Sequence, residues 1–365
     1  MGVIKELVAL ESPSDDRHAL DRCAAALAAR FAASGAAITR VPAGTTADHV
    51  LAEWPGTGPT VLVLGHFDTV WPIGQLSRMA IREDDGRLYG PGVFDMKAGL
   101  GIGLLAIRAL HSDAANGTRP RVMFLATSDE EVGSGTSRET IERLAKDSAA
   151  VLVLEPSLPG GAVKTARKGV GEFEVIAHGI AAHAGVDPDA GASAVHELAR
   201  QISRIEALSD RARGLSVNVG VIDGGTRPNV VAERARAMVD VRIARLSDAA
   251  AVTAALNGLT PTNQRVRLEV RGGINRPPME RTEGVARLYN LARDSARELG
   301  FDLQEGATGG GSDGNFTAAL GVPTLDGLGA VGDGPHALHE HIIIHELPRR
   351  AALVAGVLAR IGAVG

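Results

Sequence analysis

His66 and Asp68 stand two residues apart in "VLVLGHFDTVWP", where an apolar run gives way to polar residues. In a β-strand, side chains at positions i and i+2 point to the same face of the sheet. We therefore expect the Asp68 carboxylate to reach an imidazole nitrogen of His66, as a metal-bound histidine usually requires of its neighbour. Taken alone, the stretch also fits a strand-end histidine beside a solvated aspartate.

Acidic residues follow two further apolar runs in the same way. Asp129, Glu130 and Glu131 follow "VMFLATS", and Glu155 follows "AVLVL". Simple surface exposure explains one such strand end well and three in succession much less well. Adjacent residues at a strand end need not point to the same place, so one glutamate can bind metal while the other transfers protons. The pattern favours an active site, although a solvated acidic turn is the simpler alternative for the glutamate pair.

Helices and strands alternate in the first part of the chain. The strands "PTVLVLGHFD", "RPRVMFLATSDEEVG" and "AAVLVLEPS" are separated by the helices "MKAGLGIGLLAIRAL" and "SGTSRETIERLAKD". Continuous apolar strands between helices predict an α/β fold, with a mostly parallel sheet covered by helices on both faces. In such sheets functional residues gather at the carboxyl ends of the strands.

The pattern changes at residue 169. Alternating strands and helices follow in the order β-α-β-β-α-β, and the α/β pattern resumes after "NRPPME". This order predicts a small α+β sandwich of ferredoxin-like type with an antiparallel sheet. We expect a discontinuous catalytic domain of residues 1–168 and 278–365, interrupted by an inserted domain of residues 169–277.

Composition limits the classes of partner. The 365 residues have a formal net charge of −5 and 3% aromatic residues, which argues against nucleic-acid binding. Cys23 is the single cysteine, so the sequence offers neither a disulfide framework nor a thiolate metal cluster. The N-terminus lacks the pattern of a signal peptide, and no apolar run approaches the roughly 20 residues that span a bilayer. We expect a cytoplasmic protein that does not bind membranes.

Eight short motifs occur in order along most of the chain. They are "GHFDTV", "GPGVFDMKAG", "SDEEVGS", "LEPS", "AHAG", "NVVAERARAMVDVR", "GGGSDG" and "GDGPHALHE". Together they resemble the co-catalytic dizinc exopeptidases that include glutamate carboxypeptidase, aminoacylase and succinyl-diaminopimelate desuccinylase. Within that family the motifs are most similar to those of bacterial glutamate carboxypeptidase. The resemblance implies a zinc-exopeptidase-like fold, with the inserted domain serving as a lid and as the contact surface of a homodimer.

The resemblance also implies two Zn²⁺ ions per subunit, with Co²⁺ or Mn²⁺ as possible substitutes. Five residues would hold them: His66 and Glu155 one ion, Glu131 and His336 the other, and Asp95 both. By the same resemblance Glu130 is the general base, and Asp68 orients His66.

Two of these assignments have competitors in the sequence. His336 is chosen over three later histidines because it follows a Gly-rich turn and stands four residues before Glu340. Asp95 lies in a glycine-flanked loop that opens a helix, which is also typical of a phosphate-binding loop. However, Lys97 is not followed by the Ser or Thr that such a loop requires. The resemblance further implies a cis peptide bond after Asp95.

Substrate binding would fall largely to the inserted domain. The resemblance places His183 in the partner's active site, where it polarises the scissile carbonyl. It assigns the substrate carboxylate to Asn229, Arg242, Arg276, Gly311 and Ser312. A planar guanidinium suits this task because it can bind a carboxylate through two parallel hydrogen bonds. From the residues alone, Arg242 also fits a surface salt bridge, and Arg276 a structural position before two prolines.

We therefore expect a zinc hydrolase that cleaves the amide bond of a peptide or N-acyl amino acid and releases a C-terminal amino acid with a free carboxylate. A preference for glutamate would need a second basic residue to bind the side-chain carboxylate of the substrate. Lys164, Arg167 and Lys168 are the candidates for that role. The alternative is an aminoacylase or an aminohydrolase that acts on a non-peptide carboxylate substrate. A third class, an inactive scaffold, would not require the complete set of ligands and base.

Overall fold

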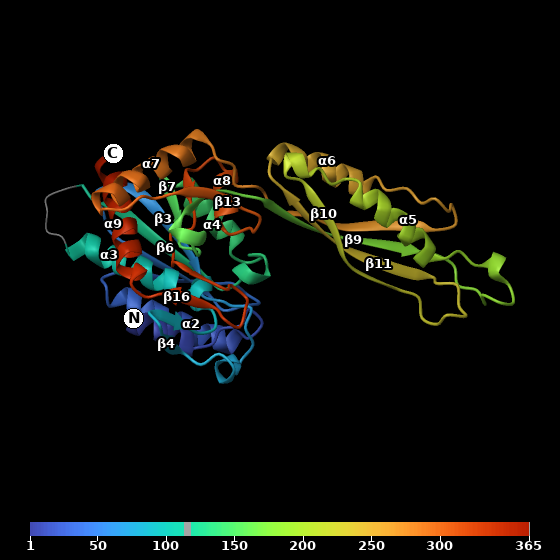
Figure 1. The fold of residues 1–365 in the computed structure, drawn as a ribbon, viewed down its shortest axis with the longest axis horizontal. Helices are drawn as coiled ribbons and strands as arrows, with labels where there is room; N and C mark the ends of the chain where they lie inside the picture. Colours follow the sequence, from blue (N-terminus) through green and yellow to red (C-terminus); the bar gives the residue numbers. More distant parts are fainter. Residues whose placement is uncertain (113–117, 365) are drawn as a thin grey trace. The chain divides into compact units, whose positions relative to one another are not determined.

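The computed structural model describes residues 1–112 and 118–364, and this chain folds into two compact units (Figure 1). Unit 1 contains Met1–Ala166, Arg281–Ala307 and Ser312–Gly365, and unit 2 contains Arg167–Glu280 and Thr308–Gly311. Unit 2 thus begins two residues before and ends three residues after the range 169–277 expected from the sequence, and it also includes Thr308–Gly311. Within the described ranges, none of the helices combines the length and the apolar character needed to cross a bilayer.

Unit 1 is built on a six-stranded sheet. Its strands are β1 (Ala37–Val41), β2 (His49–Trp54), β3 (Gly58–His66), β6 (Pro120–Thr127), β7 (Ala150–Val153) and β14 (Thr324–Leu325). They are ordered β1-β2-β6-β3-β7-β14, and the four strands from β6 to β14 are parallel. β1 and β2 form an antiparallel edge that the sequence analysis did not predict. The expected mostly parallel sheet is confirmed.

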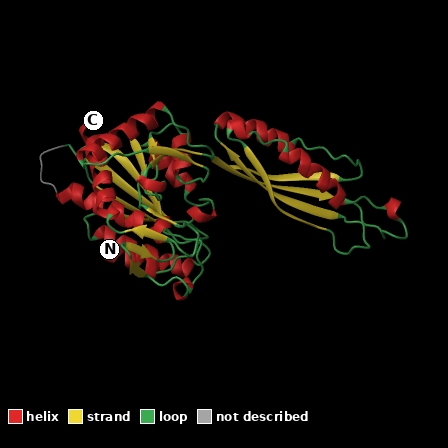
Figure 2. Cartoon of the chain, viewed as in Figure 1, coloured by secondary structure: helices red, strands yellow, loops and turns green. Residues whose placement is uncertain are grey.

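Helices cover both faces of this sheet, as expected (Figure 2). They are α1 (Gly2–Ala9), α2 (Arg17–Ala32), α3 (Ala98–Ser112), α4 (Arg138–Lys146), α7 (Glu283–Glu298), α8 (Gly314–Ala319) and α9 (Glu346–Val364). Val61 and Val63 of β3 belong to the apolar cluster of α1, α2, α3, α7 and α9. Leu62 and Leu64 belong to the cluster of α4 and α8 on the other face. The strand is apolar throughout because both of its faces are buried.

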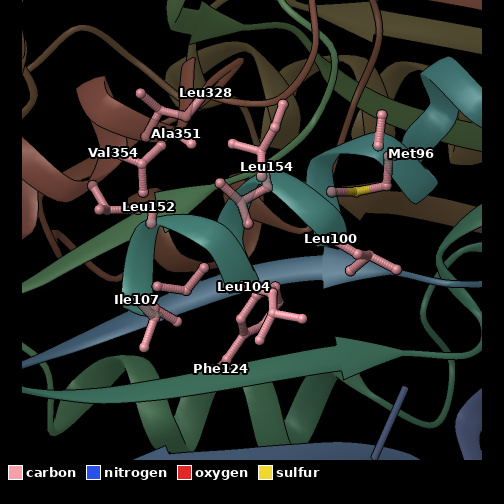
Figure 3. Close-up of a cluster of buried hydrophobic side chains, with 14 of the residues drawn as sticks. Met96, Leu100, Leu104, Ile107, Phe124, Leu152, Leu154, Leu328, Ala351 and Val354 are labelled. Carbon is pink, nitrogen blue, oxygen red and sulfur yellow. The ribbon is translucent and has the colours of Figure 1, made fainter. Parts of the chain in front are cut away.

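The start of α3 packs tightly against the end of β7. A Cβ atom at Gly99 would lie 2.1 Å from the carbonyl oxygen of Leu154, so only glycine permits this approach. Further along the helix, Leu104 lies in the same buried cluster as Leu154 and Phe124 (Figure 3). This packing fixes the first turn of α3 and with it the preceding loop, which carries Asp95.

Two smaller sheets contain the remaining strands of this part of the fold. The strands are β4 (Arg82–Asp84), β5 (Arg87–Tyr89), β8 (Val163–Arg167), β13 (Glu305–Thr308), β15 (Gly332–Asp333) and β16 (His341–Ile343). One sheet has the order β15-β16-β5-β4, and the other consists of β13 and β8. His341 of β16 pairs with Tyr89 of β5, which brings the chain just after His336 beside the chain just before Asp95. This pairing was not predicted from the sequence.

Unit 2 is an antiparallel sheet with two helices on one face (Figure 2). Its elements are β9 (Gly169–His178), α5 (Ala194–Glu206), β10 (Ser216–Gly224), β11 (Arg234–Ile243), α6 (Leu246–Asn257) and β12 (Arg267–Arg276). The sheet has the order β10-β11-β9-β12. Alternate residues of β9, such as Phe173 and Val175, pack against the helices. The predicted β-α-β-β-α-β order is confirmed.

Candidate metal centre

The strands of unit 1 bring several predicted site residues to one edge of the sheet. β3 ends at His66, which is paired with Thr127 at the end of the parallel strand β6. Glu131 lies in the short turn after β6, and Glu155 lies two residues after β7 ends. Because the carboxyl ends of parallel strands meet at the same edge, all three candidate ligands gather there.

Two loops bring the remaining candidate ligands to this edge. Asp95 lies in the irregular turn Val93–Lys97 before α3, and its peptide bond to Met96 is cis, as the resemblance implied. His336 lies between β15 and β16 and has a left-handed backbone conformation, with φ of 61°.

Asp95 lies between the two histidines. Its Oδ1 is 3.2 Å from Nε2 of His66, and its Oδ2 is 3.4 Å from Nε2 of His336. The same nitrogen of His66 is 3.5 Å from Oε1 of Glu155, and that of His336 is 3.3 Å from Oε2 of Glu131. Each oxygen of Asp95 therefore faces a different histidine and carboxylate pair.

The histidine-to-carboxylate separations around Asp95 are compatible with two metal ions. Two atoms that each lie about 2.0–2.2 Å from a tetrahedral Zn²⁺ are about 3.3–3.6 Å apart, close to the separations around Asp95. In addition, Oε1 of Glu131 is buried and has no hydrogen-bond partner in the described part of the chain. A buried carboxylate oxygen without a partner is costly unless a cation binds it. The donor set of imidazole nitrogens and carboxylate oxygens also suits zinc.

In the metal-free protein, protons on the histidines balance the carboxylates. Burial lowers the pKa of His66, but hydrogen bonds to Asp68, Asp95 and Glu155 outweigh it and hold this pKa well above its usual value. Hydrogen bonds to Asp95 and Glu131 raise the pKa of His336 to about 10. Burial raises the pKa of Glu131 in spite of its contact with His336. A histidine must be neutral to bind a metal ion, so metal binding would compete with protonation of these imidazoles.

Asp68 makes more contacts than the sequence suggested. Its Oδ1 is 3.4 Å from Nδ1 of His66, but its backbone carbonyl oxygen is closer to that nitrogen, at 3.0 Å. The carboxylate accepts hydrogen bonds from the backbone amides of Glu130 and Glu131, both at 3.2 Å, and from the hydroxyl of Ser14 at 2.8 Å. Asp68 therefore fixes the turn that carries both glutamates as well as the ring of His66.

Glu130 lies beside the candidate ligands. Its carboxylate and the ligand atoms of His66 and Glu155 all lie within 4.8 Å of one another. Its neighbour Glu131 forms a similar group with His66 and Asp95. The two adjacent glutamates thus face different parts of one site, as a division between proton transfer and metal binding requires.

A family model described as peptidase family M20/M25/M40 matches residues 62–360, most of the chain. The chain belongs to this family. It is accordingly a metal-binding hydrolase, either a peptidase or an amidohydrolase. Carboxypeptidase G2 of Pseudomonas sp. (strain RS-16) is 29% identical over 99% of this chain and 88% of the relative. Succinyl-diaminopimelate desuccinylase of Dechloromonas aromatica is 27% identical over 84% of each chain.

Solved structures of M20 peptidases have the same fold. A tripeptidase from Staphylococcus aureus superposes with a TM-score of 0.80 at 22% identity, over 99% of this chain and 97% of the other. The metallo-carboxypeptidase Sso-CP2 from Sulfolobus solfataricus superposes with a TM-score of 0.78 at 18% identity, over 98% of both chains. A dinuclear metal-binding peptidase of family M20 from Bacillus subtilis superposes with a TM-score of 0.70 at 16% identity, over 99% of this chain and 98% of the other.

In this M20 chain, the predicted substrate residues of unit 2 form two separate groups. The backbone amide of Ala184 donates to the carbonyl oxygen of Asn229, so Asn229 lies beside His183. Arg242 and Arg276 lie instead at Gly309–Gly311, where Arg242 contacts the carbonyl oxygen of Gly309. β11 separates the groups, and at about 3.4 Å per residue its length from Arg234 to Arg242 is about 27 Å. The family resemblance had implied that Asn229 acts together with the arginines.

Four predicted substrate residues already have partners or are buried, and Arg276 is one of the buried ones. Arg242 binds the carboxylate of Asp240 through two nitrogens, the salt bridge that the sequence also allowed. Ser312 is fully buried and donates its hydroxyl hydrogen to Asp326 at 2.6 Å, so it supports the loop. Lys164 is also buried.

Two residues near the predicted sites were not assigned a firm role from the sequence. The Arg167 guanidinium donates to the carbonyl oxygens of Gly310 and Gly311, at 3.2 and 3.0 Å, and lies within the arginine group of unit 2. Glu340 is buried in unit 1 and accepts hydrogen bonds from the Asp95 loop. Its spacing from His336 was the one sequence signal that pointed to it.

Proposed function

We propose that the chain is a dinuclear zinc hydrolase that cleaves the amide bond of a peptide or N-acyl amino acid. The product would be a C-terminal amino acid with a free carboxylate. The observation that carries the proposal is the position of Asp95, whose two oxygens lie 3.2 and 3.4 Å from Nε2 of His66 and of His336. The similarity to carboxypeptidase G2 supports the direction of cleavage.

In this proposal His66, Asp95 and Glu155 would hold one metal ion, and His336, Asp95 and Glu131 would hold the other. Zinc suits these nitrogen and oxygen ligands, and Co²⁺ or Mn²⁺ would fit the same set. When bound, such ions lower the pKa of a water molecule and polarise a carbonyl group. The protein supplies the remaining steps.

Glu130 is the proposed general base. Its carboxylate would take a proton from the attacking water and return it to the nitrogen of the leaving amine. The hydrogen bond from its backbone amide to Asp68 supports the turn that carries it. Asp68 would act through His66 and through this turn, without touching the substrate.

Arg242 and Arg276 are the proposed clamp for the substrate carboxylate, together with Gly311. A planar guanidinium binds a carboxylate through two parallel hydrogen bonds, which Asp240 shows on Arg242 in the present structure. An incoming substrate carboxylate would replace the Asp240 carboxylate on Arg242 or bind to Arg242 beside it. Arg167 in the same group is a candidate for a second carboxylate, alongside Lys164.

The active enzyme is proposed to be a homodimer formed through unit 2. β11 lies between the group of His183 and Asn229 and the arginines, and its length from Arg234 to Arg242 is about 27 Å, so one small substrate would not touch both groups of one copy. A second copy would supply His183 and Asn229 to the site that uses the arginines of the first. β10 lies at the edge of its sheet and exposes Val221 and Ile222, a surface suited to symmetric pairing.

The substrate class is tested with N-acyl amino acids and dipeptides whose terminal carboxylate is free, amidated or esterified. We expect the zinc-loaded enzyme to release free amine from the compounds with a free carboxylate. Arg242→Ala should lower kcat/KM for these by about 10–100-fold, the effect of losing one charged hydrogen-bonding partner. Arg236→Ala, on the same strand but paired with Asp223, is the matched control and should keep the preference. Equal cleavage of free and blocked carboxylates would contradict the proposed substrate, and would favour an aminohydrolase of the same family.

A further inference from the structure

Glu340 is a fully buried carboxylate that binds the loop of Asp95. Its Oε1 accepts hydrogen bonds from the backbone amides of Phe94 and Asp95, at 2.9 and 3.1 Å. Its Oε2 accepts from the amide of Gly92 at 2.9 Å and from the indole nitrogen of Trp71 at 2.8 Å. Three of these four donors thus belong to the short segment that ends at the proposed bridging ligand.

These bonds use the full capacity of the carboxylate. An ionised carboxyl group has about four lone-pair sites and no hydrogen to donate. Each oxygen of Glu340 accepts hydrogen bonds from two N–H groups, so all four lone-pair sites of the carboxylate are used. Hydrogen bonds to a charged partner are about twice as strong as neutral ones, which makes this contact a firm support for the loop.

Glu340 also connects the Asp95 loop to the loop of His336. The backbone amide of Glu340 donates to the carbonyl oxygen of Ala337 at 2.9 Å, which closes the turn that follows His336. Directly after Glu340, His341 pairs with Tyr89 of β5. One side chain therefore fixes the Asp95 loop to the segment that positions His336.

We propose that Glu340 is a positioning residue that sets the orientation of Asp95 relative to His336 and thereby determines how tightly the metal pair is held. The inference rests on the proposed dinuclear site. Glu340 touches neither the substrate nor a metal ion. It acts through the backbone of the Asp95 loop, and Trp71 supports it from the loop that follows Asp68.

Glu340→Gln is the informative substitution because it keeps the size of the side chain. An amide presents one oxygen and one NH₂ group, so two of the four N–H donors would face another donor. We expect zinc affinity, measured by competition with a chromophoric chelator, to fall by about 10–100-fold, as for other residues that support metal ligands. The absorption spectrum of the Co²⁺-loaded variant should differ from that of the wild type, and kcat should fall more than KM rises.

Glu197→Gln is the matched control. Glu197 is a buried carboxylate of unit 2 that accepts from the backbone amides of Thr262 and Asn263, at 2.8 and 3.0 Å. Its replacement loses the same kind of contact away from the candidate ligands. Metal affinity and the Co²⁺ spectrum should stay at the wild-type values even if the thermal stability falls.

Trp71→Phe provides a second test. It removes one donor to Glu340 and leaves the carboxylate in place, so zinc affinity should fall by about 2–10-fold, as expected for one hydrogen bond. If metal-free Glu340→Gln fails to fold, the Trp71→Phe result decides the question, and an unchanged affinity overturns the proposal.

The outcomes separate this inference from the proposed function. A wild-type protein that fails to bind two metal ions overturns both. A wild type that binds two ions, with a folded Glu340→Gln variant of equal zinc affinity and identical Co²⁺ spectrum, overturns the positioning role alone. Lower affinity with an altered spectrum in Glu340→Gln, and neither change in Glu197→Gln, supports it.

Discussion

Nδ1 of His66 lies 3.0 Å from the backbone carbonyl oxygen of Asp68. A carbonyl oxygen can only accept, so in the neutral imidazole Nδ1 carries the proton and Nε2 presents its lone pair toward Asp95. The backbone thus holds the tautomer that a metal ligand needs. The Asp68 carboxylate adds negative charge behind the ring and binds the amides of Glu130 and Glu131.

We predict that Asp68→Asn folds normally and lowers kcat by about 10–100-fold. The backbone carbonyl still fixes the His66 tautomer, but one amide of the glutamate turn would face the NH₂ group of the new side chain. Zinc affinity should therefore fall less than kcat. Steady-state kinetics and zinc retention against a chelator measure the two effects. Ser14→Ala removes only the hydroxyl bound to Asp68 and should have a smaller effect. Normal kinetics in Asp68→Asn would contradict a role of this carboxylate in supporting the site.

Glu130→Gln and Glu131→Gln should separate proton transfer from metal binding. In the first variant we expect both metal ions to stay bound while kcat falls by about 10²–10⁴-fold, the usual contribution of a general base. In the second we expect loss of one ion, because Oε2 of Glu131 faces His336 and its Oε1 is buried with no partner among the residues that the structure describes. Metal analysis of the purified variants checks this. The reverse pattern would mean that the two roles are exchanged.

Three of the five candidate metal ligands follow a local signal in the sequence. His66, Glu131 and Glu155 stand where apolar strands end, and a parallel sheet brings such ends to one edge. The element order of unit 2 was also readable, since its strands alternate and its helices have one apolar face. Both predictions depend on periodicity within short segments, which a single sequence contains.

Metal binding should release protons and strengthen as pH rises. His336 has a pKa of about 10 in the metal-free protein, so it is protonated at neutral pH, and a metal ion must displace that proton. For one proton released, zinc affinity should rise about tenfold per pH unit below that pKa. Calorimetric titrations in buffers of different ionisation enthalpy count the protons. His345→Ala, an exposed histidine paired with Glu346, is the control and should release as many as the wild type. A zinc affinity that does not change with pH would contradict the protonation of His336.

Subunit mixing tests whether His183 acts in the partner's site. Inactive Glu130→Gln and His183→Ala chains are combined and allowed to exchange. Each mixed dimer then has one site without both groups and one complete site, so we expect about half of the wild-type activity per mixed dimer. A mixture of His183→Ala with Asn229→Ala should stay inactive, because these residues lie side by side and each site would lack one of them. Proven exchange without recovery in the first mixture would show that His183 does not act in trans.

Contacts between distant segments could not be predicted from the sequence. Glu340 and the amide of Gly92 are 248 residues apart, and their hydrogen bond depends on the pairing of β16 with β5. These strands are three residues long, too short to show an alternating pattern. Ser312 has a polar side chain in a Gly-rich loop, and nothing local indicates that its hydroxyl is buried against Asp326.

Anomalous diffraction from zinc-loaded crystals tests the central claim most directly. The account predicts two peaks, one beside each oxygen of Asp95: the first among His66, Asp95 and Glu155, and the second among His336, Asp95 and Glu131. A single peak, or two peaks away from Asp95 in crystals of active enzyme, would contradict it.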